Sequence, residues 1–346
     1  MNRVGPTLYL LIQYKDMEKQ IDFLAIGDIV TDAFIKINDA GIICDENNEH
    51  CNLCLRYSDK IPYESVDIFN AVGNSANAAV CASRLGVNSS LISYIGDDSV
   101  GKDNMESLIK ESVLTDHMMI APEMKSNYHY VLWYKTDRTI LVKHTEFPYS
   151  FPMDISEPKW IYLSSLASNS VNYHSEIIEY LKQHPNVKLA FQPGTFQMKM
   201  GYEILKDVYT NAEVLLCNFE EAERILRIEE KDKVKIMTML YNLGPKIVVV
   251  TDGTNGAYAY DGKDAWFIKS YPGEPVERTG AGDAFSATFV TALSLGKSIQ
   301  EALLWSPINA MSVVSYVGAQ KGLLSRENIE ESLTTAPEDF KPIKIN

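Results

Sequence analysis

The sequence predicts an α/β fold in which a mostly parallel sheet is covered by helices on both faces and carries a small β-sheet lid. From residue 160 onward, continuous apolar strands alternate with helices, a pattern typical of a parallel sheet buried on both sides. Residues 127–144 instead alternate aromatic or β-branched side chains with polar ones, as in a hairpin with one solvated face. Since no internal repeat or Pro/Gly linker divides the chain, we expect one main domain.

The first half of the chain begins with a short apolar strand that ends at a glycine. A polar, cysteine-bearing stretch then separates two segments that we assign to the lid. A helix rich in small residues follows, and a strand and a second helix come after it. These elements are expected, in order, at 21–27, 34–40, 63–69, 73–86, 89–96 and 101–112.

The second half supplies most of the sheet. Strands are expected at 160–165, 187–192, 213–218, 246–253 and 256–262, and helices near 172–184, 219–227, 232–243, 282–295 and 299–317. We place the main domain at 20–335, with lid segments near 34–69 and 125–147 and a C-terminal tail at 336–346. Residues 1–19 are interpreted as a dispensable extension, because the chain from Met17 already has a polar lead, an apolar strand and a loop.

Composition limits the function. The chain has 346 residues, is 46% hydrophobic and carries a net charge of -14. This negative charge argues against a nucleic-acid partner, since such proteins concentrate Lys and Arg. No apolar run reaches the roughly 18 residues of a membrane span, and the run at 7–12 lacks a cleavage site, so we expect neither a membrane segment nor a signal peptide.

Five cysteines, an odd number in a large chain, indicate a reducing cytoplasm rather than a disulfide scaffold. Three of them gather with a histidine in the lid stretch: Cys44, His50, Cys51 and Cys54. Four such ligands could close a zinc site. Their spacing matches no standard zinc pattern, however, and we favour free cysteines.

The motif Thr-Gly-Ala-Gly-Asp at 279–283 precedes a segment with helical spacing. At a helix start, the N–H groups of Gly280, Ala281 and Gly282 would be free donors for an anion. Asp283 on the first turn could take a proton from an attacking hydroxyl. The alternative is a helix cap and tight turn in which Asp283 complements the helix dipole.

A second cluster could bind hydroxyl groups. Gly73 permits close backbone approach, and Asn74 and Asn77 offer amide donors and acceptors. Asp28 and Asp32 follow the first strand, where ligands of open α/β sheets bind. The alternative for the Gly/Asn cluster is a helix N-terminus with an asparagine cap.

Two further clusters could serve a nucleotide. Asn218 ends a strand and Glu221 lies three residues on, where a carboxylate could order the water shell of Mg²⁺; a capping pair is the alternative. Thr251, Gly253 and Gly256 could let the backbone lie beside a nucleotide, or could form only a hairpin turn.

Arg138 in the lid hairpin could reach a charged substrate or a phosphate, although a solvated turn residue is the simpler reading. No histidine forms a nucleophile–base pair that would indicate a hydrolase. The chain also lacks a GxxxxGK[ST] loop, so any phosphates must be held in another way.

Taken in order, these pieces resemble the ribokinase-like family of carbohydrate kinases, also called the phosphofructokinase B family. The resemblance spans about residues 20 to 325 and rests on the segments GDIVTD, VGNSANAAV, LGVNSSLISYIGDDSVGKD, NFEEAERI, VTDGTNGAYAY, ERTGAGDAFSATFVTAL and INAMSVVSYVGAQ. It implies a three-layer α/β/α domain with a small β lid. It also implies transfer of the γ-phosphoryl group of ATP, with Mg²⁺, to a hydroxymethyl group of a monosaccharide or sugar acid.

The resemblance also implies roles for the residues named above. Asp283 would be the catalytic base and 280–282 the anion hole. The residues implied to bind sugar are Asp32, Gly73, Asn74 and Asn77; those implied to serve phosphate and magnesium are Asn218 and Glu221; those implied to line the nucleotide site are Thr251, Gly253, Gly256 and Asn309. Lid sheets in this family often pair between subunits, which favours a homodimer.

The chain departs from the family pattern in three places. Glu277-Arg278-Thr279 stands where many relatives have Asp-Thr-Thr. In relatives that use K⁺, the Asp of that triplet is a ligand, so the resemblance makes Glu277 the candidate ligand of a monovalent cation such as K⁺. Val30 stands where ribokinases proper have Asn. Gln192 stands in a strand-end sequence that differs from the common family pattern, and we assign no ligand to it.

Two other functions stay open. A nucleoside kinase of the same superfamily would use the lid aromatics Tyr128, Tyr130 and Trp133 to stack on a base. A sugar sensor without catalysis would keep the fold and lose turnover. The intact Asp283 and its glycines argue against the sensor.

Overall fold

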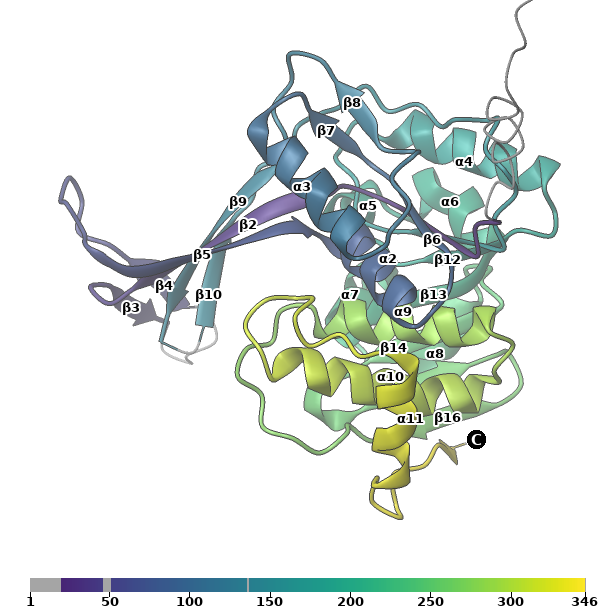
Figure 1. Ribbon diagram of the computed structural model, residues 1–346. Helices are drawn as coiled ribbons and strands as arrows, with labels where there is room; N and C mark the ends of the chain where they lie inside the picture. The colour runs from purple at the N-terminus through teal and green to yellow at the C-terminus, as the bar shows by residue number, and fades with distance from the viewer. Residues whose placement is uncertain (1–19, 46–50, 136, 346) are drawn as a thin grey trace, which may run out of the picture.

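The computed structural model describes residues 20–45, 51–135 and 137–345 of the chain (Figure 1). Its main sheet has nine strands in the order β17-β16-β15-β14-β13-β12-β11-β1-β6. Six neighbouring strands of this order pair in parallel: β14, β13, β12, β11, β1 and β6. Strands β15, β16 and β17 continue the sheet beyond β14 as an antiparallel edge. The strand bounds are β1 Phe23–Ile26, β6 Ser89–Ile92, β11 Trp160–Leu163, β12 Lys188–Phe191, β13 Ala212–Asn218, β14 Ile247–Thr251, β15 Ala257–Tyr260, β16 Ala265–Ile268 and β17 Ile343–Lys344.

Helices cover both faces of this sheet, which confirms the predicted α/β class. Successive residues of a strand point to opposite faces. In β1, Phe23 and Ala25 accordingly pack in one apolar core with helices α2, α9 and α10, whereas Leu24 and Ile26 pack in a second core with α4, α6 and α8. Both cores are fully enclosed, and the result is a three-layer α/β/α body.

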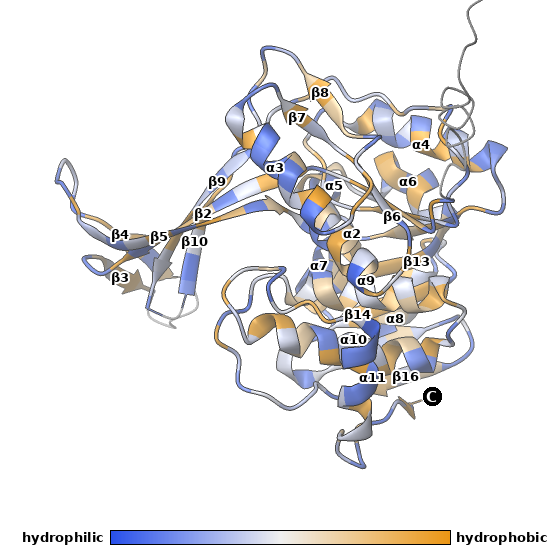
Figure 2. Ribbon diagram, viewed as in Figure 1, coloured by the Kyte–Doolittle hydropathy of each residue, from blue (hydrophilic) through white to orange (hydrophobic). Residues whose placement is uncertain are grey.

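Most helices lie where the 3.6-residue spacing predicts them. The bounds are α2 Asn74–Arg84, α3 Ser99–Lys110, α4 Val171–Gln183, α5 Thr195–Met200, α6 Tyr202–Asn211, α7 Phe219–Leu226, α8 Lys233–Tyr241, α9 Ala281–Ser294, α10 Ile299–Val314 and α11 Arg326–Thr334. Helices α5, α6 and α11 were not predicted from the sequence. Helices such as α4 and α10 carry both hydrophobic and hydrophilic residues, because one side faces the sheet and the other faces solvent (Figure 2).

The lid is a separate four-stranded sheet with the order β10-β9-β2-β5, and it projects from the body in Figure 1. Its strands are β2 Val30–Ile37, β5 Tyr63–Val72, β9 Tyr128–Tyr134 and β10 Asp137–Leu141. Strand β2 follows β1 almost at once, and β5 leads into α2. The lid therefore grows directly from the ends of the elements that surround the predicted site.

Two small sheets complete the architecture: the pair β7 Tyr94–Gly96 with β8 Met119–Ala121, and the hairpin β3 Gly41–Cys44 with β4 Cys51–Cys54. Among the described residues, the structure contains no helix that is both long and apolar enough to cross a bilayer. The predicted extension at 1–19 lies outside the described residues.

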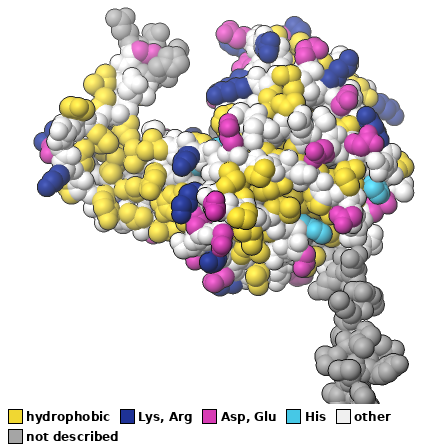
Figure 3. Space-filling model, turned by 90° about the horizontal axis from the view of Figure 1, so that it is seen from above, with side chains coloured by type: hydrophobic (Ala, Val, Ile, Leu, Met, Phe, Trp, Pro, Cys, Tyr) yellow, Lys and Arg dark blue, Asp and Glu magenta, His cyan; other side chains and the backbone are white. Residues whose placement is uncertain are grey.

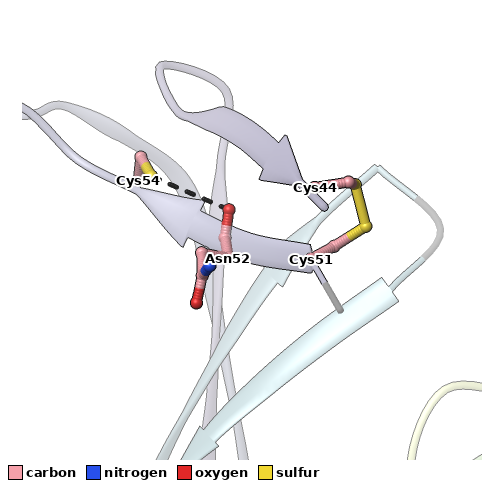
Figure 4. The surroundings of a disulfide bond; sticks show 4 residues. All are labelled: Cys44, Cys51, Asn52 and Cys54. Carbon is pink, nitrogen blue, oxygen red and sulfur yellow. Dashed lines mark hydrogen bonds between the residues drawn. A yellow bond between two sulfur atoms is a disulfide. The ribbon is translucent and has the colours of Figure 1, made fainter. Parts of the chain in front are cut away.

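Two of the lid cysteines are bonded to each other, contrary to the prediction of free cysteines. The antiparallel register of β3 and β4 places Cys44 directly opposite Cys51, and the two form a disulfide (Figure 4). Opposed positions bring side chains close together, a proximity that cysteine spacing along the chain does not reveal. Cys44 and Cys51 are therefore neither free thiols nor zinc ligands, whereas Cys54 is a free thiol. His50 of the proposed zinc set lies outside the described residues.

Candidate active site

Helix α9 begins at the glycine motif. Gly280 is its N-cap, with a φ of 80° that disfavours any side chain, and a Cβ there would lie 2.5 Å from the Cβ of Ala319. A Cβ on Gly282, by contrast, would meet nothing within 4 Å. The first N–H groups of a helix have no intrahelical acceptor. The turn is therefore packed tightly on its protein side and open on the side where an anion could bind.

Three side-chain amides hold the carboxylate of Asp283 on the first turn of α9. Asn74 Nδ2 and Gln192 Nε2 donate to Oδ1 at 2.7 and 3.2 Å, and Asn77 Nδ2 donates to Oδ2 at 2.8 Å. Burial raises the pKa of Asp283, and the amide hydrogen bonds oppose this rise only in part. The arrangement is an oriented carboxylate that is more basic than a free aspartate.

Two of these amides, those of Asn77 and Gln192, are themselves held by hydrogen bonds to their oxygens. Gln320 Nε2 donates to Asn77 Oδ1 at 3.0 Å, and the hydroxyl of Tyr162 donates to Gln192 Oε1. Because these amide oxygens accept bonds elsewhere, the NH₂ groups must face Asp283. Gln192 had no predicted role. Its place at the end of β12, beside the ends of β11 and β13, was the one available signal.

The two predicted aspartates of the first loop have different surroundings. Asp28 is 3% exposed, and both of its oxygens are engaged, by the Tyr149 hydroxyl at 2.7 Å and by His144 Nδ1 at 3.0 Å. Burial beside Asp28 raises the pKa of Tyr149. Asp28 therefore anchors the segment around 144–149, and this arrangement argues against the predicted sugar contact.

Asp32 lies on the lid, opposite His129 of the neighbouring strand β9. Its Oδ1 lies 3.3 Å from His129 Nδ1 but has no hydrogen-bond partner among the described residues. Buried polar atoms are normally hydrogen-bonded. Asp32 thus has an acceptor that a ligand hydroxyl could satisfy.

Gly73 is the N-cap of α2, with a φ of 101°, and a Cβ there would lie 2.8 Å from the carbonyl oxygen of Asp28. The glycine is thus required where the Asp28 loop crosses the start of α2. Its position brings Asn74 and Asn77 to Asp283.

Asn218 and Glu221 form the capping pair that the sequence offered as an alternative. Glu221 N donates to Asn218 Oδ1 at 2.8 Å, and Asn218 N donates to Glu221 Oε2 at 2.9 Å. Burial, with the nearby Asp283 charge adding to it, raises the pKa of Glu221. A divalent cation would relieve this concentration of negative charge, so the donor set fits Mg²⁺ held through water.

The nucleotide candidates lie beside this pair. Thr251, the last residue of β14, is the register partner of Asn218 on β13. Gly253 opens a short 3₁₀ turn with a φ of 53°, and a Cβ there would meet nothing within 4 Å. A Cβ on Gly256 would lie 2.2 Å from the Ile268 carbonyl oxygen, so this glycine serves the turn itself.

The surroundings of Asn309 argue against the nucleotide contact implied for it. Its side chain is fully buried on α10, donates to Thr288 Oγ1 at 2.8 Å and accepts from Leu324 N at 2.9 Å. A side chain with no exposed surface and with its polar groups already bonded offers no free group to a nucleotide. Asn309 instead ties α10 to α9 and to the loop that follows α10.

Arg138 of the lid contacts Glu277 of the body. Arg138 Nη1 donates to Glu277 Oε1, which also accepts from Thr279 N at 2.8 Å and from Thr279 Oγ1 at 2.5 Å. Burial lowers the pKa of Arg138, and the carboxylates of Asp32 and Asp137 oppose that shift. The guanidinium is therefore held among acidic groups.

The model of the pfkB family carbohydrate kinase matches residues 57–326. The ribokinase of Bacillus subtilis (strain 168) is 27% identical over 267 residues, which cover 76% of this chain and 87% of the relative. The 5-dehydro-2-deoxygluconokinase of Geobacillus thermodenitrificans is 24% identical over 344 residues, covering 91% of this chain and 94% of that protein.

Solved structures share the fold. The Arabidopsis thaliana ribokinase complexed with ribose and ATP matches with a TM-score of 0.74 at 19% identity, over 91% of this chain and 99% of that one. An Escherichia coli protein described as ribokinase II, in complex with ATP and Mg²⁺, gives 0.70 at 17% identity over 91% and 99%. The Methanocaldococcus jannaschii nucleoside kinase gives 0.73 at 19% identity over 92% and 99%.

The matched family segment includes the amides of α2, the Asn218 pair and the glycine turn with its aspartate, and it covers most of the chain. This chain belongs to the pfkB family and is a carbohydrate kinase, a phosphotransferase with an alcohol group as acceptor.

Proposed function

We propose that the chain transfers the γ-phosphoryl group of ATP to a hydroxymethyl group of a monosaccharide or sugar acid, with Asp283 as general base and 280–282 as the anion hole. The observation that carries the proposal is the carboxylate of Asp283, held by three amides on the first turn of a helix whose N-terminal side is open. A base beside free N–H donors is what phosphoryl transfer requires.

The chemistry follows from this geometry. Asp283 accepts the proton of the attacking hydroxyl while that oxygen forms its bond to the γ-phosphorus. The bond from this phosphorus to the oxygen that bridges it to the β-phosphate breaks, and ADP leaves. Each carboxylate oxygen has more than one lone pair, so the amide bonds from Asn74, Asn77 and Gln192 leave room for the substrate hydroxyl. The N–H groups at 280–282 stabilise the charge on the transferred group.

ATP would lie over the ends of β13 and β14. Thr251 and Gly253 would contact it, and Asn218 and Glu221 would hold Mg²⁺ through water. Relatives bound to ATP and to ATP with Mg²⁺ support this part of the proposal. Mg²⁺ supplies charge neutralisation for the phosphates. Glu277 is the residue that could bind K⁺, since its Oε2 is buried without a hydrogen-bond partner among the described residues.

The sugar would lie between the lid and Asp283. Asp32 Oδ1 is a buried acceptor without a hydrogen bond among the described residues, and Arg138 lies on the same face of the lid. Directly paired strand positions share a face. The row that joins Trp133 to Arg138 is accordingly on the side of His129 and Asp32, and a carboxylate of a sugar acid would meet positive charge there.

The opposite face of the lid supports the predicted homodimer. The four-strand row of Ile68, Ala33, Tyr130 and Leu141 lies on that face. Figure 3 shows hydrophobic side chains gathered over the lid. Within this row Ile68, Tyr130 and Leu141 are 57%, 49% and 52% exposed. A second lid would cover this surface, and we expect the double variant Ile68→Lys, Tyr130→Glu to sediment as a monomer.

We also propose a cytoplasmic location for the protein, since the proposed reaction consumes ATP.

The nucleoside-kinase alternative draws support from the archaeal nucleoside kinase that shares the fold. Of the three lid aromatics, however, Tyr128 and Tyr130 lie on the face opposite His129, and only Trp133 shares the face of Asp32. One aromatic ring remains for a base, which favours a sugar.

A substrate panel tests the proposal. Release of ADP would be measured with pentoses, hexoses, keto-deoxy sugar acids and nucleosides in the presence of Mg-ATP. We expect one strong sugar or sugar-acid substrate, and Asp283→Asn should lower its kcat by about 10²–10⁴-fold while sugar-induced thermal stabilisation remains. Near-normal turnover of that variant would refute the role of Asp283. A nucleoside as the sole substrate would establish the alternative, and sugar binding without turnover would indicate a sensor.

A further inference from the structure

The contact between Arg138 and Glu277 connects the lid to the turn before α9. Arg138 lies on β10, an edge strand of the lid, and Glu277 lies three residues before the Gly280 cap. The two side chains are 27% and 6% exposed, and 139 positions separate them in the sequence. The ion pair is thus largely shielded from water and joins two separate parts of the fold.

Glu277 passes this contact on to the anion hole. The same oxygen that accepts from Arg138 also accepts the backbone N–H and the hydroxyl of Thr279. Thr279 immediately precedes Gly280. One carboxylate oxygen therefore holds the turn that orients the first N–H groups of α9.

The charges explain why Arg138 is needed for this arrangement. A carboxylate that is only 7% exposed requires a positive partner or loses its charge. The described residues offer it one ion pair, that with Arg138. On the other side, Arg138 lies close enough to Asp32 for the two charges to interact, which brings it near the proposed sugar contact.

We propose that Arg138 is a positioning residue that couples closure of the lid to the geometry of the anion hole. With the lid closed, Arg138 neutralises Glu277, and Glu277 holds Thr279 and the 277–280 turn in the shape that aims the N–H groups at the phosphoryl group. With the lid open, Glu277 loses its ion pair with Arg138, and the turn relaxes. Phosphoryl transfer then depends on a lid that has closed over the sugar, which limits transfer to water. This inference rests on the proposed function of the 280–282 turn.

Hydrogen exchange of the purified protein tests the coupling without any knowledge of the substrate. In Arg138→Ala, the amides of 277–282 should exchange about 10-fold faster or more, because the acceptor of the Thr279 N–H is no longer held. Arg138→Lys keeps the charge and should restore part of the protection. Arg56→Ala is the matched control, since Arg56 is a lid arginine whose ion pairs, with Asp39 and Asp59, stay within the lid. Unchanged exchange at 277–282 in Arg138→Ala would overturn the proposal.

Kinetics with the substrate identified by the panel test the catalytic consequence. Arg138→Ala should lower kcat by up to about 100-fold, because misplacement of stabilising groups by about 1 Å costs this much. KM for ATP should change little, and millimolar guanidinium should restore part of the rate in Arg138→Ala but not in Glu277→Ala. A loosened turn with an unchanged kcat would refute the positioning role. If exchange responds as expected but no phosphorylated product forms with any substrate, the coupling stands and the proposed function fails.

Discussion

Replacing Gln192 with glutamate should move the pH dependence of the reaction upward. Gln192 Nε2 lies 3.2 Å from Asp283 Oδ1, and Gln192→Glu would put a carboxylate oxygen in place of this donor. Two charges at this separation repel by about 5 kcal/mol at an effective dielectric constant of about 20. That energy corresponds to about 4 pKa units, and rearrangement and proton sharing between the two carboxyls should leave about 1 to 3.

The sign of the shift follows from the role of Asp283. A general base works in its ionised form, and a neighbouring negative charge favours the protonated form. The acid limb of the kcat/KM profile should therefore move to higher pH, with the plateau rate approached at alkaline pH. The assay is ADP release between pH 5 and 9 with the substrate from the panel.

Two control variants separate charge from geometry. Gln192→Leu removes one hydrogen bond to Asp283 without adding a charge, and we expect an upward shift of about 1 unit or less. Tyr162→Phe keeps the amide but removes the hydroxyl that orients it, and it should lower kcat with a still smaller shift. An acid limb in Gln192→Glu that coincides with the wild-type limb would show that Asp283 is not the titrating base.

Three further predictions concern folding and the lid. Gly280→Ala should destabilise the protein by about 1–3 kcal/mol, because Gly280 has a positive φ and its Cβ would lie 2.5 Å from the Cβ of Ala319. Gly282→Ala places its methyl group in open space on the side where the anion would bind, and it should keep the Tm but lower kcat. Equal losses of Tm in the two variants would contradict this. Burial lowers the pKa of His174 to about 4. Between pH 6.5 and 4 the unfolded chain therefore binds a proton that the folded protein does not, and the free energy of unfolding falls by up to about 3 kcal/mol as the pH drops through this window. Urea unfolding of His174→Gln should show a smaller fall, and an identical fall would argue against His174 as the source. Cys44→Ser removes the lid disulfide and should leave the Tm of the body within about 1 °C, because the bridged strands lie outside both apolar cores of the body. Loss of the folded body in differential scanning calorimetry would contradict this.

The sequence by itself determined the class of the fold and the place of the catalytic candidate. Alternation of apolar strands with helical segments is a local property, since each strand and helix records its own burial in the period of its residues. The motif at 279–283 is also local: Gly280 needs a left-handed φ, and an acid on the first turn follows within three residues. The matched family covers the same segments.

The tertiary structure decided the partners of these groups. Gln192 meets Asp283 from 91 positions away, and Arg138 meets Glu277 from 139 positions away. Such contacts depend on which strands become neighbours and in what register. Asn309 and Asp28 show the converse, because both match motif positions and both are buried with their polar groups already bonded. A sequence pattern records which residue types a site requires, whereas the free surface of each side chain is set only when distant segments pack against it.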